Sequence, residues 1–219
     1  MISPNAIFWE VDVQRDFVLP GGKLYVPGAE ELVPNFDRLT EAARQDRVFL
    51  VTSADSHRPD DPEIREWPPH CLENTPGAEI LSGALAPRRL VVRSRGEFVL
   101  PNDLGGFQQV VLEKNTLDVF DNPRAETLLN RFTPRGAPPF APDPEFFVFG
   151  VVTEFCVRCT VEGLLRRSRR VTVVTDAIQS LDPEKGRRLL NDWQARGVRF
   201  VTTDEALQQV NAARRAQSA

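Results

Sequence analysis

Short apolar runs rich in strand-forming residues alternate with longer stretches of helical periodicity along most of the chain. Most of the runs are nearly continuous in Val, Leu, Ile and Phe, which is typical of strands covered on both faces. Such alternation favours a mostly parallel sheet between two layers of helices, a three-layer α/β/α sandwich. The expected strands are residues 7–11, 48–52, 90–92, 110–112, 146–149, 171–175 and 198–201. The expected helices are residues 29–43, 123–131, 154–167, 183–196 and 204–215.

The length of 219 residues suits a single domain spanning residues 1–219. Residues 133–144 interrupt the alternation, because five of these twelve are proline. The alternation resumes directly afterwards, so this segment is expected to be a long surface loop rather than a linker. Our hypothesis is that it contributes to a subunit contact.

Charge and cysteine content exclude several classes of protein. The net charge is −4, and the basic residues form no long tract, so neither nucleic acid nor a membrane surface is expected as a partner. No signal peptide is evident, and no apolar run approaches the ~20 residues of a membrane helix. Three cysteines do not make a disulfide framework. We therefore expect a cytoplasmic protein with a catalytic or buried thiol.

Chemically versatile side chains follow the expected strands. Asp12 follows the first, Asp55 and His57 the second, Lys114 the fourth, and Cys156 comes shortly after the fifth. Ligands of open α/β sheets bind beyond the carboxyl ends of the strands. We therefore expect a carboxylate, metal-type ligands, an amine and a thiol to meet at one edge of the sheet.

Cys156 is the candidate nucleophile. It lies in the first turn of an expected helix, where the helix dipole and free N–H groups lower a thiol pKa. The alternative is a buried structural cysteine, which is the expectation for Cys71 and Cys159. Asp12 can accept the thiol proton and later deliver it to a leaving amine, while a partly buried Lys114 can hold both groups. Considered singly, Asp12 is better explained as a helix or loop cap and Lys114 as a solvated strand end.

The chain has only two histidines, His57 and His70, and both fall within one short segment that also contains Asp55. On an extended segment, Asp55 and His57 point the same way. A second imidazole from the following loop would complete three ligands with open positions for water or substrate. This pattern predicts a catalytic site for one divalent metal ion, and Zn²⁺, Fe²⁺ and Mn²⁺ all suit it.

Taken together, these residues resemble the isochorismatase-like cysteine hydrolases, and within that superfamily the nicotinamidases. The resemblance runs in order from about Phe8 to Thr175. The segments that carry it are Asp12-Val-Gln14-Arg-Asp16-Phe17, Asp55-x-His57, Trp67-Pro-Pro-His70-Cys, Thr75-Pro-Gly-Ala, Glu113-Lys114 and Gly150-Val-Val-Thr-Glu-Phe-Cys156-Val.

The resemblance implies a six-stranded parallel sheet, usually in homo-oligomers, and hydrolysis of a small amide through a thioester. It implies a triad of Asp12, Lys114 and Cys156, and metal ligands Asp55, His57 and His70. Phe17 and Trp67 would be aromatic walls for a flat heterocycle. A non-proline cis peptide at Val151–Val152 would direct the N–H groups of Val152 and Cys156 at a developing oxyanion.

The sequence also departs from the nicotinamidase pattern. The run after Lys114 is Asn-Thr-Leu-Asp-Val-Phe-Asp-Asn-Pro, which is closer to other members of the superfamily, and Ser56 replaces the usual aromatic between Asp55 and His57. Nicotinamide is the expected substrate, with another small amide or carbamoyl compound as the alternative. A more distant alternative is a non-catalytic binding protein on the same fold.

Overall fold

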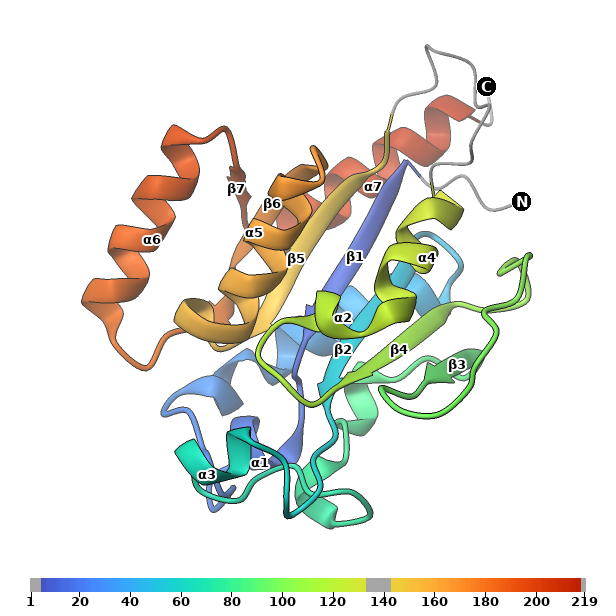
Figure 1. Ribbon diagram of the computed structural model, residues 1–219. Coiled ribbons are helices and arrows are strands. Elements are labelled where there is room, and N and C mark those ends of the chain that lie inside the picture. The colour runs from blue at the N-terminus through green and yellow to red at the C-terminus, as the bar shows by residue number, and fades with distance from the viewer. Residues whose placement is uncertain (1–4, 133–142, 218–219) are drawn as a thin grey trace.

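The computed structural model describes residues 5–132 and 143–217. Its centre is a seven-stranded sheet in the order β3-β4-β2-β1-β5-β6-β7 (Figure 1). Every neighbouring pair of strands is parallel, as the continuous apolar runs predict. The strands are β1 (Ala6–Val11), β2 (Phe49–Asp55), β3 (Arg89–Val92), β4 (Gln109–Lys114), β5 (Glu145–Val151), β6 (Arg170–Gln179) and β7 (Arg199–Val201).

All seven apolar runs are strands, so the expected three-layer fold is confirmed. The strand number of six, implied by the resemblance, differs by one. The shortest strand, β7, lies at one edge of the sheet, where short strands are common. There β7 pairs with β6 over Thr172↔Arg199 to Val174↔Val201.

Five longer helices cover the sheet, with α2 and α7 on one face and α4, α5 and α6 on the other (Figure 1). Shorter helical turns lie in the loops. The longer helices are α2 (Val33–Arg44), α4 (Pro123–Phe132), α5 (Arg158–Arg166), α6 (Pro183–Ala195) and α7 (Thr203–Gln217). The short ones are α1 (Arg15–Val18), α3 (Glu63–Glu66), the 3-10 turns η1 (Ala29–Leu32), η2 (Pro76–Ala78), η3 (Ser82–Ala84) and η4 (Val119–Asp121), and the π-helical turn η5 (Thr153–Val157).

Two hydrophobic cores flank the sheet. On β1, Ile7 and Trp9 face the core beneath α4, α5 and α6, whereas Phe8 faces the core beneath α2 and α7. This alternation follows from the two-residue period of a strand. Most of the proline-rich segment falls within residues 133–142, so the subunit contact assigned to it lies outside the described residues. In the described residues, 5–132 and 143–217, no helix is both long and apolar enough to cross a membrane.

Glu10 is a fully buried carboxyl group near the carboxyl end of β1. Its oxygens accept hydrogen bonds from the hydroxyls of Thr52 at 3.0 Å and Thr40 at 3.4 Å. Burial raises the pKa of Glu10 to about 8, although the two hydroxyls and Arg44 oppose the rise. The folded protein therefore retains this proton at pH values where the unfolded chain, with a pKa of 4.5, has lost it.

Because the native state binds more protons between those two pKa values, the free energy of unfolding should fall as pH rises through them. Glu10→Gln mimics the neutral acid, so it should stabilise the protein by ~3–5 kcal/mol at pH 9 and by little near pH 5. Urea unfolding at both pH values measures this difference. The exposed Glu31→Gln variant is the control, and equal gains at the two pH values would contradict the assignment.

Candidate active site and metal centre

The sequence-predicted side chains meet at the carboxyl edge of the sheet, where chain connections diverge on either side of β1. Asp12 follows β1 with a left-handed φ of 52°, and its N–H donates to Ser53 O at 3.0 Å. Asp55 and Lys114 end β2 and β4 and are register partners. Cys156 lies in η5, just beyond β5. The carboxyl ends of the parallel strands thus bring together residues from four separate parts of the chain.

Lys114 links the thiol to the two carboxylates. Its Nζ lies 2.9 Å from Asp12 Oδ2 and donates a hydrogen bond to Cys156 Sγ at 3.5 Å. The same Nζ also donates to Asp55 Oδ1. Lys114, Asp12 and Asp55 are each at most 2% exposed, and Cys156 is 6% exposed. Lys114 is therefore not a solvated strand end, and Asp12 lies inside a buried ionic cluster.

Burial controls the protonation of this cluster. It raises the pKa of Asp12 to about 7, with Lys114 opposing the rise and Asp55 reinforcing it. Burial also raises the pKa of the Cys156 thiol well above its usual value, with Lys114 opposing and both carboxylates reinforcing that rise. The lowered thiol pKa expected from the sequence is therefore not found, because desolvation of the buried thiol outweighs the effect of the nearby helix N-terminus.

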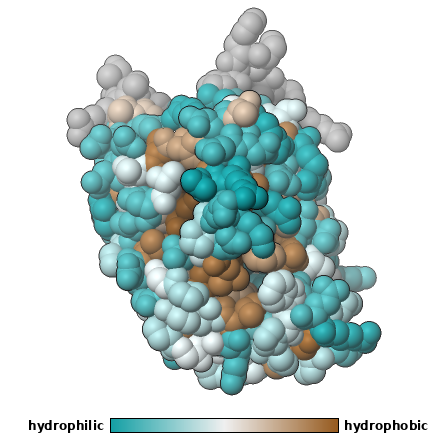
Figure 2. Space-filling view, turned by 90° about the vertical axis from the view of Figure 1, so that its left-hand side faces the viewer, coloured by the Kyte–Doolittle hydropathy of each residue, from teal (hydrophilic) through white to brown (hydrophobic). Residues whose placement is uncertain are grey.

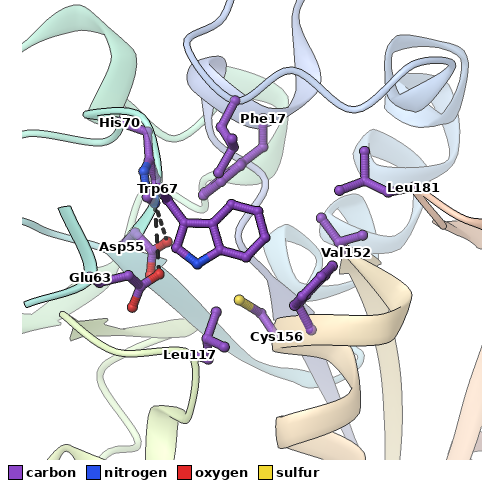
Figure 3. Close-up of a pocket in the computed structure, with 11 residues that line it drawn as sticks. Phe17, Asp55, Glu63, Trp67, His70, Leu117, Val152, Cys156 and Leu181 are labelled. Atoms are coloured by element: carbon purple, nitrogen blue, oxygen red, sulfur yellow. Dashed lines mark ion pairs between the residues drawn. The ribbon is translucent and has the colours of Figure 1, made fainter. Parts of the chain in front are cut away.

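Four side chains form a group that can hold a metal ion: Asp55, His57, Glu63 and His70. One ligand atom from each lies within 4.8 Å of the others. The Nε2 atoms of His57 and His70 each lie 3.6 Å from Asp55 Oδ2. Glu63, on α3, places Oε1 3.8 Å from His70 Nε2 (Figure 3). Glu63 was not predicted from the sequence, and its only signal was a carboxylate between the two histidines.

The donor set fits a divalent metal ion. Asp55 Oδ2 and both ring nitrogens of His57 are buried without a hydrogen-bond partner among the described residues. Buried polar atoms are normally satisfied, so Asp55 Oδ2 and His57 Nε2, which lie 3.6 Å apart, fit a bound cation. Two imidazoles with two carboxylates match the preferences of Zn²⁺, Fe²⁺ and Mn²⁺.

Other residues of the sequence motifs hold these ligands in place. The Gln14 amide donates to Asp55 O at 2.8 Å and accepts from Asp55 N at 2.7 Å. The Asp16 carboxylate accepts from Cys71 N at 2.7 Å, which fixes the loop that carries the second histidine. A Cβ on Gly77 would lie 2.1 Å from Asp16 Oδ2, so only glycine allows this approach. Gln14, Asp16 and Gly77 therefore support the site without entering it.

A pocket lined mostly by apolar side chains opens above Cys156 and reaches the metal group (Figure 3). Phe17 and Trp67, which the resemblance implies as walls for a substrate ring, both line it. The ring of Phe17 lies 5.3 Å from that of His70, and the ring of Trp67 lies 5.3 Å from that of Phe155. Sequence reasoning missed four apolar lining residues, Leu24, Leu117, Phe155 and Leu181, and expected of Val152, which also lines the pocket, only a backbone role.

Two further features concern the surroundings of the pocket. The peptide between Val151 and Val152 is cis, as the resemblance implied. On the side of the molecule that carries α3 and α6, hydrophobic side chains reach the surface among polar ones (Figure 2). Leu181, which is 43% exposed, is a pocket-lining residue that reaches solvent.

The chain matches a known protein family over most of its length. Residues 7–98 and 100–205 match the isochorismatase domain, which is most of the sequence. The protein therefore belongs to the isochorismatase domain family, and the resemblance seen in the sequence motifs is confirmed.

Several related proteins within this family are named as amide hydrolases. The nicotinamidase/pyrazinamidase of Mycobacterium tuberculosis is 29% identical over 199 residues, covering 87% of this chain and 95% of the relative. The crystal structure of the pyrazinamidase of Pyrococcus horikoshii in complex with zinc is 26% identical, with a TM-score of 0.69 over 91% of this chain and 99% of that one. An N-carbamoylsarcosine amidase from Thermoplasma acidophilum is 25% identical, with a TM-score of 0.68 over 93% and 98%. These names agree with the expected class, a hydrolase of amide C–N bonds.

Proposed function

We propose that this protein is a metal-assisted cysteine amidohydrolase that converts nicotinamide to nicotinate and ammonia. The observation that carries the proposal is the buried contact of Lys114 with Cys156, Asp12 and Asp55, because it joins a thiol–carboxylate pair to the metal group. The pocket is lined by Cys156 together with Asp55 and His70. A substrate bound there would lie between the nucleophile and the metal group.

In the proposed reaction, Asp12 takes the thiol proton as Cys156 attacks the carboxamide carbon. The raised pKa of the thiol supports a base-assisted attack over a resting thiolate. Backbone N–H groups of Val152 and Cys156 would stabilise the oxyanion, each donor contributing ~3–4 kcal/mol. Asp12 then protonates the departing ammonia, and water hydrolyses the thioester with Asp12 again as base. Lys114 holds the thiol and the carboxylate together throughout.

Asp55, His57 and His70 would hold the metal ion, and the structure adds Glu63 as a fourth candidate ligand. A divalent ion bound there would supply a coordination position that orients a ring nitrogen of the substrate. Phe17 and Trp67 would form the walls for the ring. The protein contribution is thus orientation, together with exclusion of water by the surrounding apolar side chains.

The alternative substrate class is another small amide or a carbamoyl compound. It is favoured by Leu117, which follows Lys114 in the run that departs from the nicotinamidase pattern and lines the pocket. The similarity to an N-carbamoylsarcosine amidase points the same way.

A non-catalytic binding protein is disfavoured, because a buried cluster of a lysine and two carboxylates is costly to keep without a function. A single hydrolase domain, a cytoplasmic location and a homo-oligomer stay predictions.

A comparison of nicotinamide with benzamide tests the proposal. The two amides have similar shape, but benzamide lacks the ring nitrogen, so kcat/KM should be at least ~10-fold higher for nicotinamide, equivalent to ~1.4 kcal/mol of orientation. Ammonia release measures both rates. Equal rates would remove the role of the ring nitrogen, and faster release from an N-carbamoyl amino acid would favour the alternative substrate.

A further inference from the structure

We propose that Asp61 is a positioning residue of the metal centre. Its carboxylate accepts the Nδ1 proton of His57, which leaves Nε2 free for the metal ion, and Arg95 holds that carboxylate in place. This inference rests on the proposed metal-dependent function, and it assigns a role to residues outside the four candidate ligands.

The ring of His57 lies between two carboxylates. Nε2 is 3.6 Å from Asp55 Oδ2, on the metal side, and Nδ1 is 3.7 Å from Asp61 Oδ2, on the opposite side. The His57 side chain is fully buried, and neither ring nitrogen has a hydrogen-bond partner among the described residues. Asp61 is thus the acidic group placed to receive a proton from Nδ1.

His70 has the same arrangement, and its nitrogen on the side away from the metal group already lies within hydrogen-bond distance of an acceptor. Its Nε2 also lies 3.6 Å from Asp55 Oδ2, while its Nδ1 lies 2.8 Å from the carbonyl oxygen of Pro68. A neutral imidazole that binds metal through one nitrogen carries its proton on the other, and an acceptor there fixes the tautomer and the ring orientation. By this comparison, Asp61 does for His57 what the Pro68 carbonyl does for His70.

Asp61 is itself held rigidly. It is 7% exposed, and its Oδ2 accepts a hydrogen bond from Arg58 N at 2.8 Å. The Arg95 guanidinium donates to both carboxylate oxygens through Nη2, at 2.5 Å for Oδ2. Arg95 Nη1 reaches Glu73 Oε1 at 3.0 Å. Both oxygens accept from the same arginine nitrogen and Oδ2 also accepts from Arg58 N, so the Asp61 carboxylate has a defined orientation.

The same network fixes the backbone of the histidine. His57 N donates to Cys71 O at 3.1 Å, and Glu73 N donates to His57 O at 2.8 Å. Arg95 therefore ties Asp61 to the segment that pairs with His57. From 3.7 Å, a small rotation of the imidazole would bring Nδ1 within the ~3.2 Å limit of a hydrogen bond.

The experiment is a Zn²⁺ titration of the 219-residue chain in competition with a chromophoric chelator. Asp61→Ala should weaken Zn²⁺ binding by ~10–100-fold. The matched control is Asp60→Ala, which removes the same charge from the neighbouring, exposed residue and should change the affinity less than ~2-fold. Asp61→Asn, which keeps an acceptor oxygen, should recover part of the loss.

Long-range ¹H–¹⁵N NMR of the zinc-loaded wild-type protein gives a readout that needs no variant. The chain has only two histidines, so few ring signals are expected, and both rings should carry their proton on Nδ1. A His57 proton on Nε2, or equal affinities of Asp61→Ala and Asp60→Ala, would overturn the role of Asp61 while leaving the metal site intact. A wild-type protein that binds no Zn²⁺ would overturn both.

Discussion

Replacement of Cys156 by alanine is expected to lower kcat/KM for amide hydrolysis by ~10⁴-fold or more. Cys156 is the thiol that lines the pocket and lies 3.5 Å from Lys114 Nζ. Without the sulfur there is no group to form the thioester, and only binding and oxyanion stabilisation remain. Ammonia release at several substrate concentrations measures the change.

Cys159→Ala is the matched control. Cys159 lies one turn further along the chain, is half-buried and does not line the pocket, so its removal should leave kcat/KM within ~3-fold of the wild type. If Cys156→Ala retained a tenth of the activity, the nucleophile assignment would be lost. A comparable loss in both variants would indicate a general effect of changing this segment.

Lys114→Met is expected to destabilise the folded protein by ~3–5 kcal/mol at pH 8. Its ammonium group contacts Asp12 and Asp55, and all three side chains are 1% exposed. Methionine preserves most of the volume but leaves two buried carboxylates without their cation. The cost should shrink toward pH 5, where the carboxylates can take up protons instead. Urea unfolding of the metal-free protein measures both values.

The double variant Lys114→Met/Asp12→Asn should recover part of this loss, because it removes one of the two uncompensated carboxylates. Lys185→Met is the surface control, since the Lys185 side chain is 73% exposed. A loss for Lys114→Met that is the same at pH 5 and pH 8 would mean that packing, and not charge, explains it.

The fold was accessible from the sequence because parallel strands covered on both faces need continuous apolar runs. Each of the seven runs is a strand, and each of the five helical stretches contains a longer helix. The starts of two helices were less predictable. Residues 29–32 form a 3-10 turn before Pro34 in α2, and residues 153–157 form a π-helical turn. Hydrophobic periodicity locates a helical face but does not distinguish these turn types.

The site was predictable where the strand order determined it. Asp12, Asp55 and Lys114 follow directly from the ends of β1, β2 and β4. Glu63 was missed, because its position depends on how residues 58–69 fold back between the two histidines. Leu117 and Leu181 were missed for the same reason, since both lie in loops.

The protonation of Cys156 illustrates a second limit. The sequence places the thiol near a helix start, which alone predicts a lowered pKa. The structure buries it next to Asp12 and Asp55, and this environment raises the pKa instead. Burial of an ionisable group depends on tertiary packing, which local sequence does not reveal.

The most direct test of the central claim is ammonia release from nicotinamide by the purified protein before metal removal, after chelation and after restoration of one equivalent of metal. The proposal predicts turnover that is lost on chelation and regained with the metal, while the chelated protein stays folded. Turnover that persists after complete metal removal would contradict the role of Asp55, His57, Glu63 and His70. Absence of turnover from a metal-loaded protein with a free Cys156 thiol would contradict nicotinamide as the substrate.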